Sequence, residues 1–378
     1  MPKVSITKCD NYEQSVVDSA IHEVLAPLGG ISAFVKPGQK VLIKPNILAS
    51  QSPDQAVTTH PAIITAVVKE VVKAGGIALV GDSPGNTYAN VLRTLEQTGV
   101  KKAAEDGGGK IVLFQSEGVT MVKGIPIAGA ALEADVIINL PKLKTHNLTL
   151  YTGAIKNMFG CVPGFYKSQF HVKAPHPDDF AKLLVNVFEI VRPTLNIMDA
   201  VVGMEGKGPG AAGTPRPLAI IMASTDAVAL DAVGSYLIGF KPEQIGTTVT
   251  AYKRGLGEMS LEKIKIIGVP LEKIRQANWK KPVNIYQLSK WFARPLALLI
   301  KPLLGQLQID PFIDQGKCTQ CLVCYKNCPA KTINYEKEKK IVEIDLKNCI
   351  HCFCCHELCE YSAVELKRSW LVKLMGIE

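Results

Sequence analysis

Short apolar runs alternate with helix-like patterns from the start of the chain to about residue 275. Continuous apolar runs of four or five residues are typical of strands in a parallel sheet that is covered on both faces. We expect such strands at seven places: 41–44, 77–80, 111–114, 135–139, 195–198, 218–222 and 264–268.

Several segments between these runs have the apolar spacing of amphipathic helices. The clearest begins near Pro61, after an expected N-cap at Thr59, and ends at Gly75. Two more are expected at 178–192 and 226–239. Strands that alternate with helices predict an α/β domain over residues 1–275, with a mostly parallel sheet and helices on both faces.

Eight of the eleven cysteines form two copies of one motif, C-x2-C-x2-C-x3-C. Three thiolates in one tight loop can bind one iron–sulfur cube, and in two-cluster bacterial ferredoxins the fourth cysteine ligates the other cube. The spacing therefore predicts two [4Fe–4S] clusters. The first would be held by Cys318, Cys321, Cys324 and Cys359, and the second by Cys349, Cys352, Cys355 and Cys328.

Structural zinc is the alternative, because zinc sites also use C-x2-C pairs. Those pairs normally surround one tetrahedral ion, which fits a doubled three-plus-one pattern poorly. The second copy ends in Glu360 where the usual ferredoxin pattern has proline, and this change removes no ligand. Cys354 is either a substitute ligand or a packed spare thiol, and we expect His351 and His356 to be bystanders.

Residues 313–368 resemble a bacterial-type two-cluster ferredoxin, a small α+β domain. Apolar residues alternate at Ile333 and Tyr335 and return at Ile341 and Ile344, which predicts the strand pair of such a domain. The resemblance implies that the domain accepts and passes single electrons at low potential.

The formal net charge is +9 with every cysteine counted as neutral, so bound clusters would lower it. No dense Lys/Arg run with interleaved aromatics is present, and nucleic-acid binding is not expected. The chain begins without an apolar signal core and has no run of ~20 apolar residues, so neither export nor a membrane span is expected. We expect a cytoplasmic, reducing location, where metal binding by cysteines is favoured over disulfides.

Polar residues follow five of the predicted strands. Ligands of open parallel sheets bind beyond the carboxyl ends of the strands, so these residues are expected to form one site. They are Lys44 and Asn46, Asp82 and Ser83, Lys142, Lys144 and His146, Asp199 and Glu205, and Ser224 with Asp226, which are also plausible helix caps.

The segment 142–157 is the densest part of this set, with Lys142, Lys144, His146, Lys156 and Asn157. We expect a loop that gathers positive charge around a carboxylate or phosphate. The alternative is a solvent-exposed basic loop. Two later histidines, His171 and His176, are expected to be structural, and no secure nucleotide-binding motif is present.

The ordered segments KPN, TTHPAII, GDSPG, PKLKTH, GAIKNMFG, DAVVGMEGKGPG and STDAVALDAVG together resemble the domain-of-unknown-function 362 family over most of residues 40–240. Members of that family frequently carry a C-terminal two-cluster ferredoxin module. The resemblance implies an α/β iron–sulfur protein of anaerobic metabolism, and it implies no particular substrate.

Residues 276–312 form an apolar amphipathic connector, and residues 369–378 form a short apolar tail. Prolines and charges interrupt the connector, which is too short to cross a bilayer. We expect it to pack between the domains or against another subunit. Peripheral contact with a membrane is the less favoured alternative.

These features predict an iron–sulfur oxidoreductase that passes electrons to an anionic substrate or a second cofactor. The candidate catalytic residues are His146, as a proton donor, Lys144 and Asp199. The candidate anion-binding residues are Lys44, Asn46, Asp82, Ser83, Lys142, Lys156, Asn157 and Glu205. Three of the acids, Asp82, Asp199 and Glu205, are also candidates for a divalent metal, and a flavin is a further candidate cofactor.

Two other functions remain open. The chain is alternatively a non-catalytic electron carrier or adaptor whose α/β domain docks a redox partner protein. A role in cluster assembly is a third hypothesis, and it requires labile clusters rather than the stable ones that a doubled ferredoxin motif implies.

Overall fold

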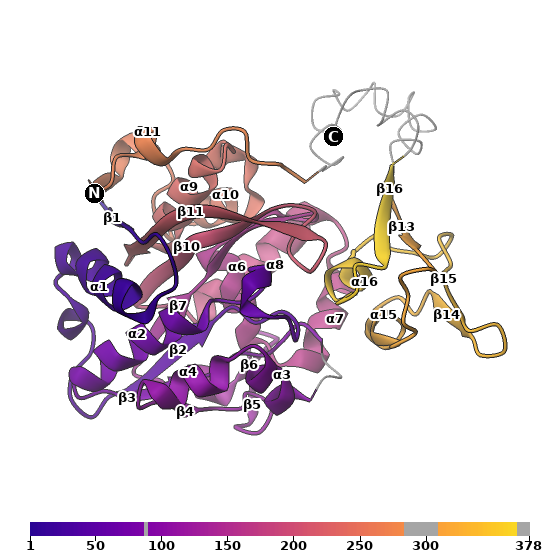
Figure 1. The fold of residues 1–378 in the computed structure, drawn as a ribbon, viewed down its shortest axis with the longest axis horizontal. Helices are drawn as coiled ribbons and strands as arrows, with labels where there is room; N and C mark the ends of the chain where they lie inside the picture. Colours follow the sequence, from indigo (N-terminus) through magenta and orange to yellow (C-terminus); the bar gives the residue numbers. More distant parts are fainter. Residues whose placement is uncertain (87–89, 283–308, 369–378) are drawn as a thin grey trace.

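The computed structural model describes residues 1–86, 90–282 and 309–368. It contains a large α/β domain and a small C-terminal domain that projects from one end of it (Figure 1). Most of the expected connector and the whole expected tail, residues 283–308 and 369–378, lie outside the described residues.

The large domain is built on one ten-stranded sheet. Its strands are β1 (Lys3–Lys8), β2 (Lys40–Pro45), β3 (Ile77–Val80), β4 (Lys110–Ile111), β7 (Val136–Leu140), β8 (Lys142–His146), β9 (Leu150–Thr152), β10 (Leu195–Gly206), β11 (Gly213–Ser224) and β12 (Lys265–Gly268). The main order is β12-β1-β11-β10-β7-β2-β3-β4, and β8 pairs with β10 and β9. The pairings of β11 with β1 and β10, and of β8 with β9, are antiparallel, and the others are parallel, which confirms the expected mostly parallel sheet.

Helices cover both faces of this sheet. One face carries α1 (Gln14–Leu25), α2 (Pro61–Lys73), α3 (Val91–Gln97) and α4 (Val100–Asp106), and the other carries α6 (Ala154–Asn157), α7 (Gly164–Lys173), α8 (Pro177–Ile190), α9 (Ala227–Leu237) and α10 (Gly246–Lys253). Successive side chains of a strand point to opposite faces. In β2, Val41 and Ile43 accordingly enter one core while Leu42 enters the other.

Shorter elements complete the large domain. They are the hairpin of β5 (Val119–Val122) and β6 (Ile125–Ala128), and the helices α5 (Gly129–Leu132) and α11 (Leu271–Ile274).

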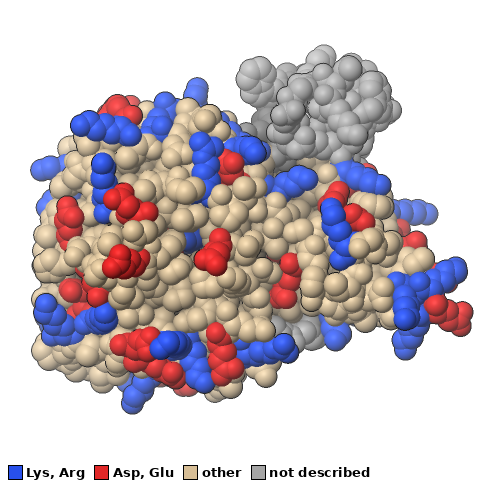
Figure 2. All heavy atoms as spheres, in the orientation of Figure 1, with Lys and Arg blue, Asp and Glu red and all other residues tan. Residues whose placement is uncertain are grey.

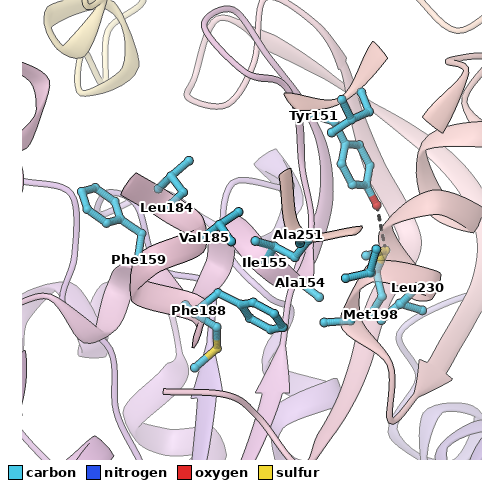
Figure 3. Close-up of a cluster of buried hydrophobic side chains, with 14 of the residues drawn as sticks. Tyr151, Ala154, Ile155, Phe159, Leu184, Val185, Phe188, Met198, Leu230 and Ala251 are labelled. Atoms are coloured by element: carbon cyan, nitrogen blue, oxygen red, sulfur yellow. Dashed lines mark hydrogen bonds between the residues drawn. The ribbon is translucent and has the colours of Figure 1, made fainter. Parts of the chain in front are cut away.

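The core between α8, α9 and the sheet supports the short helix α6. Ile155 of α6 packs among buried residues that include Phe188 and Leu230, and the Tyr151 hydroxyl lies 3.4 Å from the Met198 sulfur (Figure 3). Removing a buried side chain the size of Phe188 costs about 3–5 kcal/mol. This packing fixes the backbone that carries the polar end of α6.

Two expectations about loops are wrong. The segment 142–157 is not a loop, because β8 pairs with both β10 and β9 and residues 154–157 form α6. The strand expected at 195–198 continues to Gly206, because β11 pairs along the whole of β10. Asp199 and Glu205 therefore lie within a strand instead of beyond its end.

Two boundaries also differ. The strand expected at 111–114 is reduced to Lys110–Ile111. The N-cap of α2 is His60 rather than Thr59, because the His60 ring accepts a hydrogen bond from the Ala62 amide at 3.2 Å.

The small domain contains β13 (Ile309–Ile313), α15 (Val323–Asn327), β14 (Ile333–Glu336), β15 (Ile341–Ile344), α16 (Cys354–Glu357) and β16 (Val364–Arg368). The expected hairpin is present as β14–β15, with Ile333 opposite Ile344. Strand β13 begins inside the range expected for the connector, because it pairs with β16. Within the described ranges, no helix has both the length and the apolar character needed to cross a membrane.

Candidate functional site

The motif cysteines of the small domain surround two cavities. One cavity is lined by Cys318, Cys321, Cys324 and Cys359, and the other by Cys328, Cys349, Cys352 and Cys355. Each cavity thus takes three cysteines from one motif and the last cysteine from the other. These are the two ligand sets expected from the spacing.

Each cavity has the four-cysteine lining that an iron–sulfur cube requires. Their empty volumes, which include space open to solvent, are about 350 and 320 Å³. Among the described residues, no group of three or more His, Cys, Asp or Glu side chains could hold a metal ion. Apolar side chains such as Val342 and Ile333 complete the lining, and such a shell limits the access of water to a cluster.

The backbone around the cavities repeats an uncommon conformation. The residues two and four positions after the first cysteine have positive φ in both motifs: Gln320 (56°) and Leu322 (59°) in the first, His351 (51°) and Phe353 (61°) in the second. Such angles in residues other than glycine cost roughly 1–2 kcal/mol each. Their recurrence at equivalent positions indicates that both loops are shaped for the same kind of ligand.

A third cavity lies between the two domains, with an empty volume of about 750 Å³ that includes space open to solvent. Its α/β wall contains five of the expected site residues: Asn46, Asp82, Ser83, Lys156 and Asn157. Its other wall comes from the small domain, through Asn327, Cys354, Glu357 and Leu358. In Figure 1, α16 of the small domain faces the part of the α/β domain that contains α7.

Helix α7 contributes cavity residues that the sequence analysis missed. Lys167, Ser168 and His171 line the cavity, together with Phe159 and Phe180 from neighbouring segments. Lys167 and His171 are four residues apart and so share one face of the helix. This i, i+4 spacing is the feature of the sequence that indicates a shared position for Lys167 and His171.

Asp231 also escaped the sequence analysis, although it positions a cavity residue. Its carboxylate accepts hydrogen bonds from the amides of Ala154 (2.5 Å) and Ile155 (3.0 Å) at the start of α6. A Cβ at Gly153 would collide with this carboxylate. Burial raises the pKa of Asp231 to about 7. Asp231 therefore holds the turn from which Lys156 projects.

Lys44 does not face the cavity as a free cation. It is fully buried, and its Nζ lies 2.8 Å from Asp82 Oδ1. The other oxygen of Asp82 accepts the Ile47 amide at 2.8 Å. A Cβ at Gly160 would collide with both members of the pair, so this position requires glycine. The pair holds the ends of β2 and β3 together.

Lys142 and Asp199 form a second buried ion pair outside the cavity. Their Nζ and Oδ2 atoms are 2.8 Å apart, and both side chains are fully buried. The Tyr12 hydroxyl donates to Asp199 at 2.8 Å and accepts from Lys142 at 2.7 Å. The His60 ring stacks on Tyr12 with centroids 3.6 Å apart. Both side chains are paired within this network and neither lines the interdomain cavity, so the geometry does not support the catalytic role expected of Asp199 or the anion-binding role expected of Lys142.

Glu205 is likewise away from the cavity. Its carboxylate lies 2.7 Å from the Arg216 guanidinium and accepts the Lys280 amide at 3.0 Å. The three acids considered for a divalent metal, Asp82, Asp199 and Glu205, are thus each paired with a different cation. The structure does not bring them together.

Lys144 supports the cavity wall from behind. Its Nζ donates to the Asn46 side chain at 2.6 Å and to the Val57 carbonyl at 2.8 Å. Asn46 in turn donates to Asn157 at 2.9 Å. Burial, followed by the charge of Lys156, holds the pKa of Lys144 well below its usual range. Lys144 is therefore a positioning residue for Asn46.

His146 contacts the small domain. Its Nδ1 accepts the amides of Leu148 (3.1 Å) and Thr149 (3.4 Å), which leaves the ring hydrogen on Nε2. Burial and the charge of Lys156 hold the pKa of His146 well below its usual value, so the ring is neutral and poorly suited to the expected role of proton donor. Its Nε2 lies 3.3 Å from Glu357 Oε1. These two atoms are not aligned for a hydrogen bond, and neither has another partner among the described residues.

The basic segment is also not the solvent-exposed loop of the alternative interpretation, since Lys142, Lys144 and His146 are at most 1% exposed. Charged side chains at the surface are of both signs. Figure 2 shows Lys and Arg interspersed with Asp and Glu over both domains on this face. Lys142, Lys144 and His146 are therefore buried and do not form a basic patch at the surface.

Lys156 and Lys167 are the two lysines that line the interdomain cavity. Lys156 has neither a hydrogen bond nor an ion pair within the described part of the chain, whereas Lys167 donates to the carbonyls of Ser83 and Pro84. Burial lowers the pKa of both lysines, to about 7 for Lys167. It also lowers the pKa of His171 to about 3, so that ring is neutral. The charge of Glu357, which lines the same cavity, favours the Lys156 cation. Two lysines face this one acid and the already paired Asp82, so the cavity is suited to an anion.

Further contacts join the small domain to the α/β domain beside this cavity. Glu360 accepts the Ser50 amide at 3.3 Å, and its own carbonyl accepts from the Gln51 side chain at 3.4 Å. The departure from proline at this position thus provides a contact between domains. His356, expected to be a bystander, lies with Nε2 3.2 Å from the Lys207 carbonyl. The buried Cys354 thiol lies at the cavity wall.

Comparisons with known proteins agree with this division of the chain. Residues 41–236 match a family described as a domain of unknown function (DUF362), and residues 310–360 match a 4Fe-4S dicluster domain. A thylakoid-associated protein of Synechocystis sp. is 34% identical over 309 residues, which cover 79% of this chain and 93% of that protein.

Two solved structures have more distant similarity. The lactate racemase apoprotein from Thermoanaerobacterium thermosaccharolyticum has a TM-score of 0.41 and 11% identity, over 63% of this chain and 57% of that one. A protein from Thermotoga maritima has a TM-score of 0.35 and 13% identity, over 58% and 57% of the two chains. This chain therefore spans a little more than half the length of either structure.

Proposed function

Because this chain belongs to the DUF362 family and carries a 4Fe-4S dicluster domain, we propose that it is an iron–sulfur oxidoreductase that delivers low-potential electrons to an anionic acceptor in the interdomain cavity. Two [4Fe–4S] clusters, when bound by the two crossed cysteine sets, supply single electrons. The anaerobic and cytoplasmic setting expected from the sequence belongs to this proposal, because a reducing environment keeps the cysteines available as ligands.

One observation carries the proposal: the same cavity is lined by a lysine of the α/β domain and by residues of the second cysteine motif. Lys156 stands on one side, and Cys354 and Leu358 stand on the other. Cys354 is adjacent in sequence to the expected ligand Cys355. An acceptor in this cavity would therefore lie next to the ligand shell of the second cluster.

The residues of the chain have distinct tasks in this proposal. Lys156 and Lys167 neutralise the charge of the acceptor, while Asn46 and Asn157 orient it by hydrogen bonds. The apolar side chains and the docked small domain limit access of water, which strengthens these electrostatic contacts. No group of the chain forms a covalent bond with the acceptor.

The first cysteine set is the entrance for electrons in this proposal. Among the eight motif cysteines, Cys321 alone is classed as exposed. A ferredoxin-type domain exchanges electrons with a redox partner, and a partner can approach most closely where the ligand shell meets solvent. The second set, which contains the buried Cys352 and is adjacent in sequence to the cavity residue Cys354, is the exit.

The test begins with anaerobic purification, iron and sulfide counting, and mass spectrometry of the small molecules that co-purify. Each identified anion is then added back to dithionite-reduced protein, and reoxidation is followed by cluster absorbance. Lys156→Gln should slow reoxidation about tenfold or more, because it removes a charged contact worth roughly 1.5–3 kcal/mol. The absorption and electron paramagnetic resonance spectra of the clusters should stay unchanged.

Lys102→Gln is the matched control, since Lys102 is exposed and pairs only with Asp106 at 2.8 Å. It should reoxidise at the wild-type rate. The proposal fails if Lys156→Gln also reoxidises at that rate. A protein that reacts with no small molecule but is reoxidised by a second redox protein would be a carrier instead of an enzyme.

A further inference from the structure

The interdomain cavity has a charge that restricts its ligand. Of its lining groups, Lys156 and Lys167 are cations, Glu357 is an acid, and Asp82 is already neutralised by Lys44 at 2.8 Å. Burial raises the pKa of Glu357 to about 7. One positive charge remains when Glu357 is a carboxylate and two remain when it is protonated, so the lining is cationic in both states and a monoanion balances the first.

The described lining of the cavity contains no arginine, whose planar guanidinium binds phosphate through two hydrogen bonds. The amide of Gly164, at the start of α7, already donates to the Ser83 hydroxyl at 2.7 Å. These features favour a carboxylate over a phosphate.

The Glu357 side chain indicates that the ligand carries a hydrogen-bond donor. This side chain lines the cavity and the residue is 8% exposed. Its Oε1 is inaccessible and lies 3.3 Å from His146 Nε2, outside hydrogen-bond geometry. The carboxylate accepts no hydrogen bond from the described part of the chain, so its other oxygen is expected to accept an O–H or N–H group of the ligand.

The rest of the cavity is apolar and partly aromatic. Phe159 and Phe180 meet edge to face, with centroids 5.7 Å apart, and His171 stacks on Phe180 at 4.4 Å. Leu48 and Leu358 also line the cavity. Aromatic side chains prefer offset or edge-on contacts with other flat π systems. This lining fits a ligand with a flat ring system. Conjugated ring systems can also accept an electron.

We infer that the ligand is a small conjugated carboxylate that carries one hydrogen-bond donor, with its carboxylate between Lys156 and Lys167 and its donor at Glu357. This inference rests on the proposed function for the choice of a conjugated body.

The test is isothermal titration of the cluster-loaded full chain with benzoate, 4-hydroxybenzoate, cyclohexanecarboxylate and inorganic phosphate. We expect 4-hydroxybenzoate to bind most tightly, about tenfold better than benzoate, as one hydrogen bond to a charged group provides. Cyclohexanecarboxylate should bind more weakly than benzoate, and phosphate should not bind. Lys156→Gln and Lys167→Gln should each weaken binding about tenfold or more, and the control Lys102→Gln should not.

A measurement on the wild-type chain covers the case in which a variant fails to fold. The fluorine resonance of 3-fluoro-4-hydroxybenzoate should broaden when the clusters are reduced to their paramagnetic state, because the ligand lies beside the second cysteine set. Binding without this broadening would place the ligand elsewhere and overturn the inference.

Other results separate the inference from the proposed function. Phosphate that binds while both benzoates do not would overturn the ligand class and leave an anion site intact. Reoxidation by a co-purified anion that is not a conjugated carboxylate would do the same. If no anion binds and none reoxidises the clusters, both the inference and the proposed function fail.

Discussion

Ligand binding should depend on pH through Lys167. Desolvation by burial is the main reason why its pKa falls from 10.5 to about 7. At 1.36 kcal/mol per pKa unit, this shift means that burial disfavours the charged lysine by about 5 kcal/mol. The nearby charged or titratable groups are Asp82 and Cys161, which raise the pKa, and Lys44 and Lys156, which lower it. Glu357 and His171 line the same cavity, and burial raises the pKa of Glu357 to about 7.

A bound carboxylate supplies the counter-charge and raises the pKa of Lys167. Well below pH 7 Lys167 is already protonated, so binding takes up no proton through this group. Above pH 7 the lysine must gain a proton when the anion binds. Affinity should therefore fall as pH rises from 7 to the pKa of the complex, by up to tenfold per pH unit for this one group.

Titration calorimetry with benzoate between pH 6.5 and 9 measures the effect, because the benzoate charge is constant over this range. Buffers that are cationic when protonated avoid competition for the anion site. The enthalpy should vary with the ionisation enthalpy of the buffer above pH 7, which reports the proton uptake directly. Lys156 also has a lowered pKa, so the isolated contribution of Lys167 is the difference from Lys167→Gln.

Lys167→Gln keeps a donor for the Ser83 and Pro84 carbonyls and loses the charge. It should bind benzoate more weakly at pH 6.5 and show a smaller pH slope. A wild-type affinity that is constant from pH 6.5 to 9 would refute the reasoning. An equal slope in wild type and Lys167→Gln would assign the proton to another group.

Three further changes test how the site is built. Glu360→Pro should leave both cluster spectra unchanged but increase hydrogen exchange at residues 50–51, because it removes the carboxylate that accepts the Ser50 amide; unchanged exchange would show that this contact does not join the domains. Asp231→Ala should lower the free energy of unfolding by about 2–4 kcal/mol and weaken benzoate binding, because two buried amides lose their acceptor; denaturant titration beside calorimetry checks both effects. Lys142→Ala should destabilise the protein by roughly 3–5 kcal/mol by leaving Asp199 buried and unpaired. If the variant stays folded but no longer binds benzoate, the Lys142–Asp199 pair contributes to the binding site.

Much of the fold was predictable because its signals are local. The continuous apolar runs indicated buried strands, and helix α9 begins after Asp226, whose side chain accepts the amides of Val228 and Ala229. Strand β8 escaped prediction because its polar residues are unlike those of an ordinary buried strand. Its pairing with β10 and the buried partners of its lysines stabilise it, and these contacts come from distant parts of the chain.

The spacing of the cysteines by itself determined the two ligand sets, because a short loop limits which thiols can reach one cluster. The sequence also identified the strand ends at which a site would form. Only the tertiary structure decided which lysines are available there. Lys44 and Lys142 form ion pairs with acids 38 and 57 positions away in the chain, whereas Lys156 and Lys167 form no ion pair among the described residues. The second wall of the cavity comes from a different domain. The function of each lysine depends on the groups around its side chain, and long-range packing rather than the local sequence determines which groups these are.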